Sequence, residues 1–99
     1  MKNVKLHPVA KQELKQNISF YESKYKGLGQ DFYSEVKSSI QLISSFPELC
    51  PERNDETRRY LLNRFPYIIV YLIYNDIIWI VSIAHCKRKP DYWKNRIEK

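Results

Sequence analysis

The sequence predicts a single α+β domain over residues 1–99, in which an N-terminal strand and an antiparallel helical hairpin pack on a mostly antiparallel, four-stranded sheet, with a short C-terminal tail or helix. Three observations predict this class. The chain has 99 residues, of which 43% are hydrophobic, enough for one core. Apolar residues in the first half recur every three or four positions, as on amphipathic helices. Two runs of β-branched and aromatic residues in the second half flank a two-residue turn.

The chain is expected to open with a short strand over residues 4–6, and His7 marks the end of that strand. Pro8 suits the first turn of a helix, because the N–H that proline lacks has no partner there. The apolar spacing then predicts a helix over about residues 8–25. The residues that define it are Ala10, Leu14, Ile18, Tyr21 and Tyr25.

A second helix is expected over about residues 30–45, ending before Pro47. Its apolar face consists of Phe32, Val36, Ile40 and Ile43. Gly27 and Gly29 are the only glycines, and we expect them to form the turn between the two helices. Because this turn is short, the helices should form an antiparallel hairpin.

Three strands are expected in the second half, over residues 57–62, 67–74 and 77–85. Asn75-Asp76 reads as the two-residue turn of a hairpin. That turn would pair Tyr74 with Ile77, Leu72 with Trp79 and Val70 with Val81. Both faces of the hairpin are apolar, so it should be central in the sheet, with the helices over one face. The tail from Pro90, as a short helix through Ile97, should cover part of the other.

The positive charge of the chain lies in its second half. Residues 1–56 hold eight lysines and arginines and eight acids, whereas residues 57–99 hold nine against three. Much of this charge follows the last strand, where His, Lys, Arg, Tyr and Trp gather between residues 85 and 96. Such residues bind phosphates and stack on bases, which favours an anionic partner, nucleic acid first of all. A solvated basic surface without a partner is the simpler alternative, and it stays open.

Several other classes of protein are excluded. Two histidines and two cysteines at unrelated spacings make neither a metal site nor a disulfide framework, so we expect no metal and no cofactor. The sequence has no Gly-rich phosphate loop. Asn75-Asp76 interrupts the apolar run 65–84, which favours strands over a membrane helix. The N-terminus has no apolar leader, so we expect a cytoplasmic protein.

The order of these features resembles the RelE/ParE superfamily of toxins from bacterial type II toxin–antitoxin modules, over nearly the whole chain. The resemblance is carried by Gly27-Leu28-Gly29 at the helical corner, Arg58-Arg59, Phe65-Pro66-Tyr67, and His85-x-x-Arg88-x-Pro90-x-Tyr92-Trp93-x-x-Arg96. It implies a growth-inhibiting toxin that a cognate antitoxin neutralises in a hetero-oligomer, by laying a helix or extended segment across its surface.

The resemblance implies two different activities. RelE-like toxins cleave mRNA in the ribosomal decoding site, and ParE-like toxins inhibit DNA gyrase without being nucleases. The two long, equal helices are similar to the ParE layout, and the His- and Arg-rich strand ends are compatible with the RelE layout. Both remain open here, with a metal-independent endoribonuclease as the first hypothesis, a gyrase inhibitor as the second, and a degenerate, non-toxic member as a third.

The nuclease hypothesis defines a candidate site, since attack by a 2′-hydroxyl needs a base, cations for the phosphorane and an acid. His85 is the candidate base. Arg58 and Arg88 are the candidate cations, and Tyr92 is the candidate acid or a base-stacking platform. The residues expected to bind nucleic acid or another target are Arg59, Arg64, Lys87, Lys89, Lys94 and Arg96.

Structural roles are the alternative for several of these residues. His85 could cap the sheet by bonding a backbone carbonyl, and Tyr92 and Trp93 could anchor the tail to the sheet. We favour the structural interpretation for all three residues. Arg58 and Arg59 should point to opposite faces of their strand, so at most one of them lines a given site directly.

Overall fold

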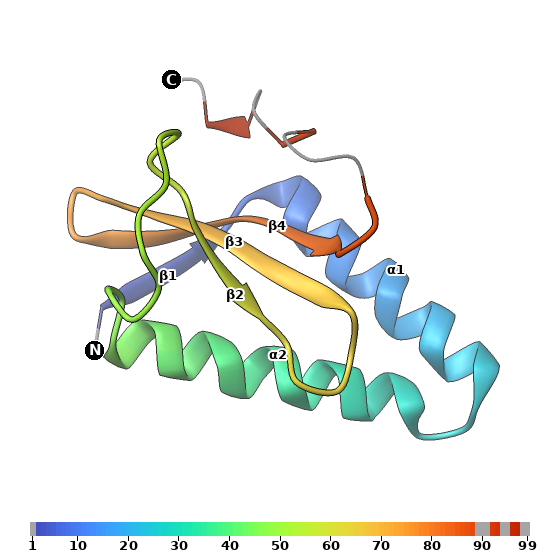
Figure 1. The fold of residues 1–99 in the computed structure, drawn as a ribbon. Helices are drawn as coiled ribbons and strands as arrows, with labels where there is room; N and C mark the ends of the chain where they lie inside the picture. Colours follow the sequence, from blue (N-terminus) through green and yellow to red (C-terminus); the bar gives the residue numbers. More distant parts are fainter. Residues whose placement is uncertain (1, 89–91, 94–95, 98–99) are drawn as a thin grey trace.

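The computed structural model describes residues 2–88, 92–93 and 96–97, and these form two helices on one face of a four-stranded sheet (Figure 1). The elements, in chain order, are β1 (Asn3–Leu6), α1 (Pro8–Lys24), α2 (Leu28–Ser45), β2 (Arg58–Leu61), β3 (Tyr67–Tyr74) and β4 (Ile77–His85). The strand order is β1-β4-β3-β2; β1 runs parallel to β4, and the other neighbours are antiparallel. The predicted α+β class is therefore confirmed.

The start of α1 is built as the sequence predicts. The side chain of His7 caps the helix, because its Nδ1 accepts the N–H of Val9 at 3.1 Å. Pro8 follows at the first helical position, where proline costs no hydrogen bond. His7 thus ends β1 and starts α1, and its N–H still donates to the carbonyl of Ile80 in β4.

The corner between the helices differs from the prediction in the role of Gly29, which lies in the first turn of α2 and not in the connecting turn. A Cβ at Gly29 would lie 2.5 Å from the carbonyl oxygen of Ile18, so the residue is glycine because α1 and α2 approach closely there. Gly27, with φ of 87°, supplies the left-handed turn residue. The Glu22 carboxylate accepts the N–H groups of both glycines at 3.0 Å.

The β3–β4 hairpin contains a bulge that the alternation of residues does not predict. The pairs Tyr74–Ile77 and Leu72–Trp79 are confirmed, but the pair Val70–Val81 is wrong: Val70 pairs with Ser82. Val81 is the extra residue, because Tyr71 pairs with Ile80. An extra residue reverses the facing of everything beyond it. Beyond the bulge, His85 therefore pairs with Tyr67 on the helix-covered side.

Each face of the sheet has its own core. The larger core joins both helices to the sheet and includes Phe32, Ile43 and Ile80, all fully buried. A smaller cluster on the opposite face joins Val70 to Trp93 of the tail, which is 1% exposed. Tyr92, Trp93 and the residues at 96 and 97 therefore cover part of that face, as expected. The rest of the predicted 90–97 helix lies outside the described residues.

Candidate functional site

A hollow of about 170 Å³ lies at the end of β4 and brings three of the predicted site residues together. His85, Arg88 and Tyr92 line it on one side. Residues of α1 and β3 close it on the other, namely Glu13, Gln16, Asn17 and Tyr67. Arg88 is brought beside His85 by a tight turn, in which its N–H donates to the His85 carbonyl at 3.0 Å. We call this the His85 hollow.

The ring of His85 is oriented by two contacts. It packs edge-on against Tyr67, with 5.1 Å between ring centroids. Its Nδ1 accepts the N–H of Lys87 at 3.0 Å. An Nδ1 that accepts a hydrogen bond carries no proton, so in this contact the ring can carry a proton only on Nε2. In this arrangement His85 is better suited to binding an acceptor than to removing a proton.

A network of polar side chains is centred on Glu13, which lines the hollow together with Tyr92. The two carboxylate oxygens of Glu13 accept from Arg96 at 3.1 and 3.3 Å and from the Tyr92 hydroxyl at 2.7 Å. They also accept from the Ser82 hydroxyl at 3.1 Å. Both members of the ion pair are largely buried, with side-chain exposures of 11% for Glu13 and 13% for Arg96.

The Glu13–Arg96 pair completes the edge of β4 where β1 ends. β1 pairs with β4 only as far as Ile80, since the chain then turns into α1. Beyond that point Glu13 accepts the N–H of Ile83 at 3.2 Å, and Arg96 donates to the carbonyl of Val81 at 3.0 Å. Two side chains thus satisfy backbone groups that a longer β1 would have paired.

The two tyrosines of the hollow are held in the protonated state. Burial, with the neighbouring Tyr21, raises the pKa of Tyr67 to about 12. Burial also raises the pKa of Tyr92, and the Glu13 carboxylate that accepts its hydroxyl adds to this. The guanidinium of Arg88 lies 3.9 Å from the centre of the Tyr92 ring, a cation–π contact that covers one face of the ring.

Three of the other predicted cations, Arg58, Arg59 and Arg64, do not line the His85 hollow. Arg58 and Arg59 point to opposite faces, as predicted: Arg58 donates to the Cys50 carbonyl and to Glu52, whereas the Arg59 guanidinium lies 5.1 Å from the Trp93 ring centre. Arg64 pairs with Asp31 of α2 at 3.5 Å. Lys87 is exposed beside His85, and Lys89 and Lys94 lie outside the described residues.

Residues 4–90 match the family described as ParE toxin of type II toxin-antitoxin system, parDE. The chain belongs to this ParE toxin family. Among solved structures, the toxin is similar in fold to a chain of the chromosomal ParDE TA system from P. aeruginosa. The TM-score is 0.63 at 15% sequence identity, and the match covers 86% of this chain and 96% of that one. The curated proteins contain no significant match to it.

Residues of α1 that sequence reasoning did not select supply much of this ParE toxin's hollow. Glu13 and Asn17 lie one turn apart on the flank of the apolar stripe of α1, and Asn17 accepts the Tyr67 hydroxyl at 3.2 Å. Their positions in the sequence could have identified these two residues, because both fall next to apolar positions of α1 that face the sheet. A carboxylate at such a position requires a buried partner, which Arg96 provides.

Other features of the toxin concern what the site could hold. Within residues 2–88, 92–93 and 96–97, no three His, Cys, Asp or Glu side chains gather to hold a metal ion. Cys50 is buried and Cys86 exposed, and both are free thiols. None of the helices in the described part of the chain is long and apolar enough to cross a membrane.

Proposed function

We propose that this ParE-family toxin inhibits DNA gyrase by binding it, without catalysis, and that a cognate antitoxin neutralises the toxin in a hetero-oligomer. Membership of the ParE toxin family over residues 4–90 supports the choice of gyrase over the ribosome. The observation that carries the non-catalytic part is the Glu13 network, which engages the hydroxyl of Tyr92 and the guanidinium of Arg96.

Most of the side chains that RNA cleavage would need in this site are already hydrogen-bonded to other groups of the protein. The Tyr92 hydroxyl donates to Glu13 and lies 2.6 Å from Ser82 Oγ, so its proton is committed within the network. The Nδ1 of His85 is committed to the Lys87 N–H. Arg58, the second candidate cation, donates a hydrogen bond to the Cys50 carbonyl of the neighbouring loop. Because these groups are already hydrogen-bonded, the site is better suited to binding a partner than to transferring protons.

A ribosome-dependent endoribonuclease is the second candidate. It is favoured by one observation, that His85 and Arg88 line the same hollow. An imidazole and a guanidinium side by side could bind and polarise a phosphate. In that case both residues would be essential for toxicity.

The test is a supercoiling assay with purified gyrase and the toxin at micromolar concentration, beside a ribosome-programmed mRNA cleavage assay. We expect inhibited supercoiling and intact mRNA. His85→Gln is the decisive variant, because glutamine keeps a hydrogen-bond donor but cannot transfer a proton near neutral pH. It should keep growth inhibition within about threefold of wild type, since the protein surface is retained.

Each other result rejects a specific part of the proposal. Cleaved mRNA, with loss of cleavage in His85→Gln, would establish the nuclease instead. Normal supercoiling and intact mRNA together, with no growth defect on induction, would indicate a degenerate member. Arg88→Ala serves as the comparison, since it removes a cation from the same hollow without altering His85.

A further inference from the structure

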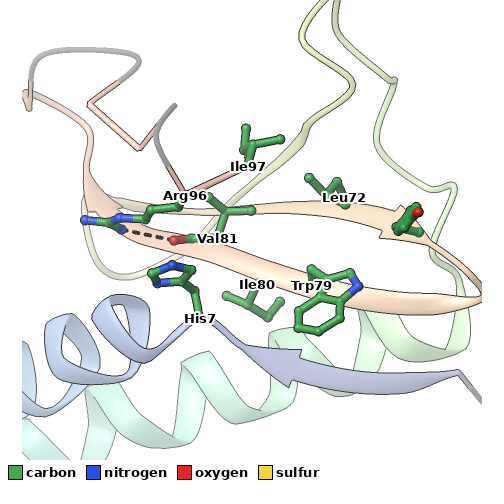
Figure 2. A pocket seen from close by; sticks show the side chains of 8 residues that line it. His7, Leu72, Trp79, Ile80, Val81, Arg96 and Ile97 are labelled. Atoms are coloured by element: carbon green, nitrogen blue, oxygen red, sulfur yellow. Dashed lines mark hydrogen bonds between the residues drawn. The ribbon is translucent and has the colours of Figure 1, made fainter. Parts of the chain in front are cut away.

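A second, apolar hollow of about 230 Å³ lies on the face of the sheet that the helices do not cover (Figure 2). His7 and Arg96 lie at one end of it and Trp79 at the other, with Val81 between them. Ile97 of the tail forms an outer wall. We call this the Trp79 hollow.

The size of the Trp79 hollow suits side chains of a protein partner. Pockets that enclose drug-sized ligands or cofactors measure about 300–1,000 Å³, which is larger than this one. Its walls are formed mainly by Leu72, Trp79, Val81 and Ile97. A hollow of this size and composition matches one or two bulky apolar side chains, which is the form that interface hot spots take.

An exposed cation lies at the rim of the hollow. None of the described residues that line the hollow carries a carboxylate, and the one guanidinium among them, that of Arg96, is paired with Glu13. Lys5 is exposed on β1 and holds its Nζ 5.6 Å from the centre of the Trp79 ring, which places a cation at the rim. The whole chain has a formal net charge of +6. Complementarity therefore calls for a partner with carboxylates beside its apolar anchors.

We propose that the Trp79 hollow is the anchor site for the antitoxin, and that it takes a leucine or aromatic side chain from an acidic segment of that protein. The inference rests on the proposed function only in assuming that an antitoxin exists. It adds the location of the contact and the chemistry of the segment that makes it.

The antitoxin fits this hollow better than the target does. Neutralisation needs a complex that dissociates slowly, and slow dissociation comes from buried apolar anchors, whereas surface charges mainly speed association. The walls of the His85 hollow are mostly polar, so it offers little such anchoring. Arg96 and Ile97 belong to the tail, so an occupant would also hold the tail against the sheet.

The test uses Leu72→Glu, which places a carboxylate in the apolar wall of the hollow. Leu72 is only partly buried, so the variant should fold. The probe is the protein encoded by the reading frame adjacent to the toxin gene, purified and titrated against full-length toxin. We expect the Kd to rise by about 30-fold or more, because the anchor would face an unpaired charge. In cells, toxicity should persist despite co-expression of the antitoxin.

Leu61→Glu is the matched control. Leu61 is 60% exposed and lies on the same face of the sheet, opposite Ile68. Ile68 is four residues from Leu72 along β3, about 13 Å. The same substitution there should change the Kd by less than about twofold. The role of the rim charge is tested by Lys5→Glu, which should slow association with the antitoxin by about tenfold at low salt. Lys15 is an exposed lysine on α1, and Lys15→Glu should slow association less.

The outcomes separate this inference from the proposed function. If the neighbouring protein fails to neutralise the wild-type toxin, the antitoxin part of the proposed function fails. If it neutralises wild type and Leu72→Glu with equal Kd, the docking inference is overturned. If Leu72→Glu binds the antitoxin normally but loses toxicity with its fold intact, the hollow belongs to the target and the inference is again overturned.

Discussion

The His85 hollow and the Trp79 hollow lie on either side of the Glu13–Arg96 ion pair, and they differ in how their side chains are used. In the His85 hollow most of the polar groups bond to one another. In the Trp79 hollow the walls are mainly apolar side chains, which remain open to a partner. The charged residues that first attract attention in the sequence are thus partly committed to the fold, and the apolar surface beside them is more available for binding.

The two hollows share one support, the tail. Tyr92 lines the first, Arg96 and Ile97 line the second, and Trp93 lies buried between them. Perturbing the tail should therefore affect both hollows, whereas changes within one hollow should stay local. The following predictions test this difference, from the largest expected effect to the smallest.

Removing the Trp93 ring should have the largest effect. Trp93→Ala empties a fully buried site and should lower the free energy of unfolding by about 3–5 kcal/mol, measured by urea denaturation. Among the described residues the indole N–H has no hydrogen-bond partner, so Trp93→Phe should cost less than about 1.5 kcal/mol. A free energy of unfolding close to wild type for Trp93→Ala would show that the ring does not anchor the tail.

Removing the Glu13 carboxylate, which lines the His85 hollow and pairs with Arg96 of the Trp79 hollow, should have the next largest effect. Glu13→Ala leaves the largely buried Arg96 guanidinium, the Tyr92 hydroxyl and the Ile83 N–H without their acceptor. We expect a loss of about 3 kcal/mol in the free energy of unfolding, because a buried charge is left unpaired. Gln16→Ala, at an exposed residue of the same hollow, is the control and should change stability by less than about 0.5 kcal/mol. A wild-type midpoint for Glu13→Ala would contradict the assigned network.

High pH should destabilise the protein through the His85 hollow. The pKa of Tyr67 is raised by burial from 10.0 to about 12, so the folded state favours the protonated phenol. The resulting stability is fully present below pH 10 and is lost as pH rises toward 12, by roughly 2–3 kcal/mol. Tyr67→Phe should reduce this decline, measured by denaturation at several pH values. Asn17→Ala keeps the phenol and should retain the decline; a Tyr67→Phe profile that matches wild type would reject this explanation.

The smallest effect is expected at Arg64, remote from both hollows. Its pair with Asp31 is solvent-exposed, with side-chain exposures of 63% and 49%. Arg64→Ala should change the free energy of unfolding by less than about 0.5 kcal/mol. Its effect on antitoxin affinity should be similarly small, which a titration can check. A large loss of affinity would place part of the docking surface at the β2–β3 connection, where Arg64 lies.

The sequence predicted the elements of this fold closely, because each rests on a local pattern. The helical periodicity located α1 and α2 to within two residues, and Asn75-Asp76 located the hairpin turn. It did not predict the bulge at Val81, since no glycine or change of pattern marks that position. The bulge decides that Ser82 faces Glu13 and that His85 faces Tyr67 and α1.

The candidate site was predicted in part for the same reason. His85, Arg88 and Tyr92 follow one another on one segment, so their proximity is a local property that the sequence determines. The class of fold and the basic character of the second half are determined in the same way. The pairing of Glu13 with Arg96, the separation of Arg58 from His85 and the existence of the Trp79 hollow depend on which strands are neighbours and where β1 stops. Those facts arise only when residues as far apart as 13 and 96 meet, so the tertiary structure alone decided them.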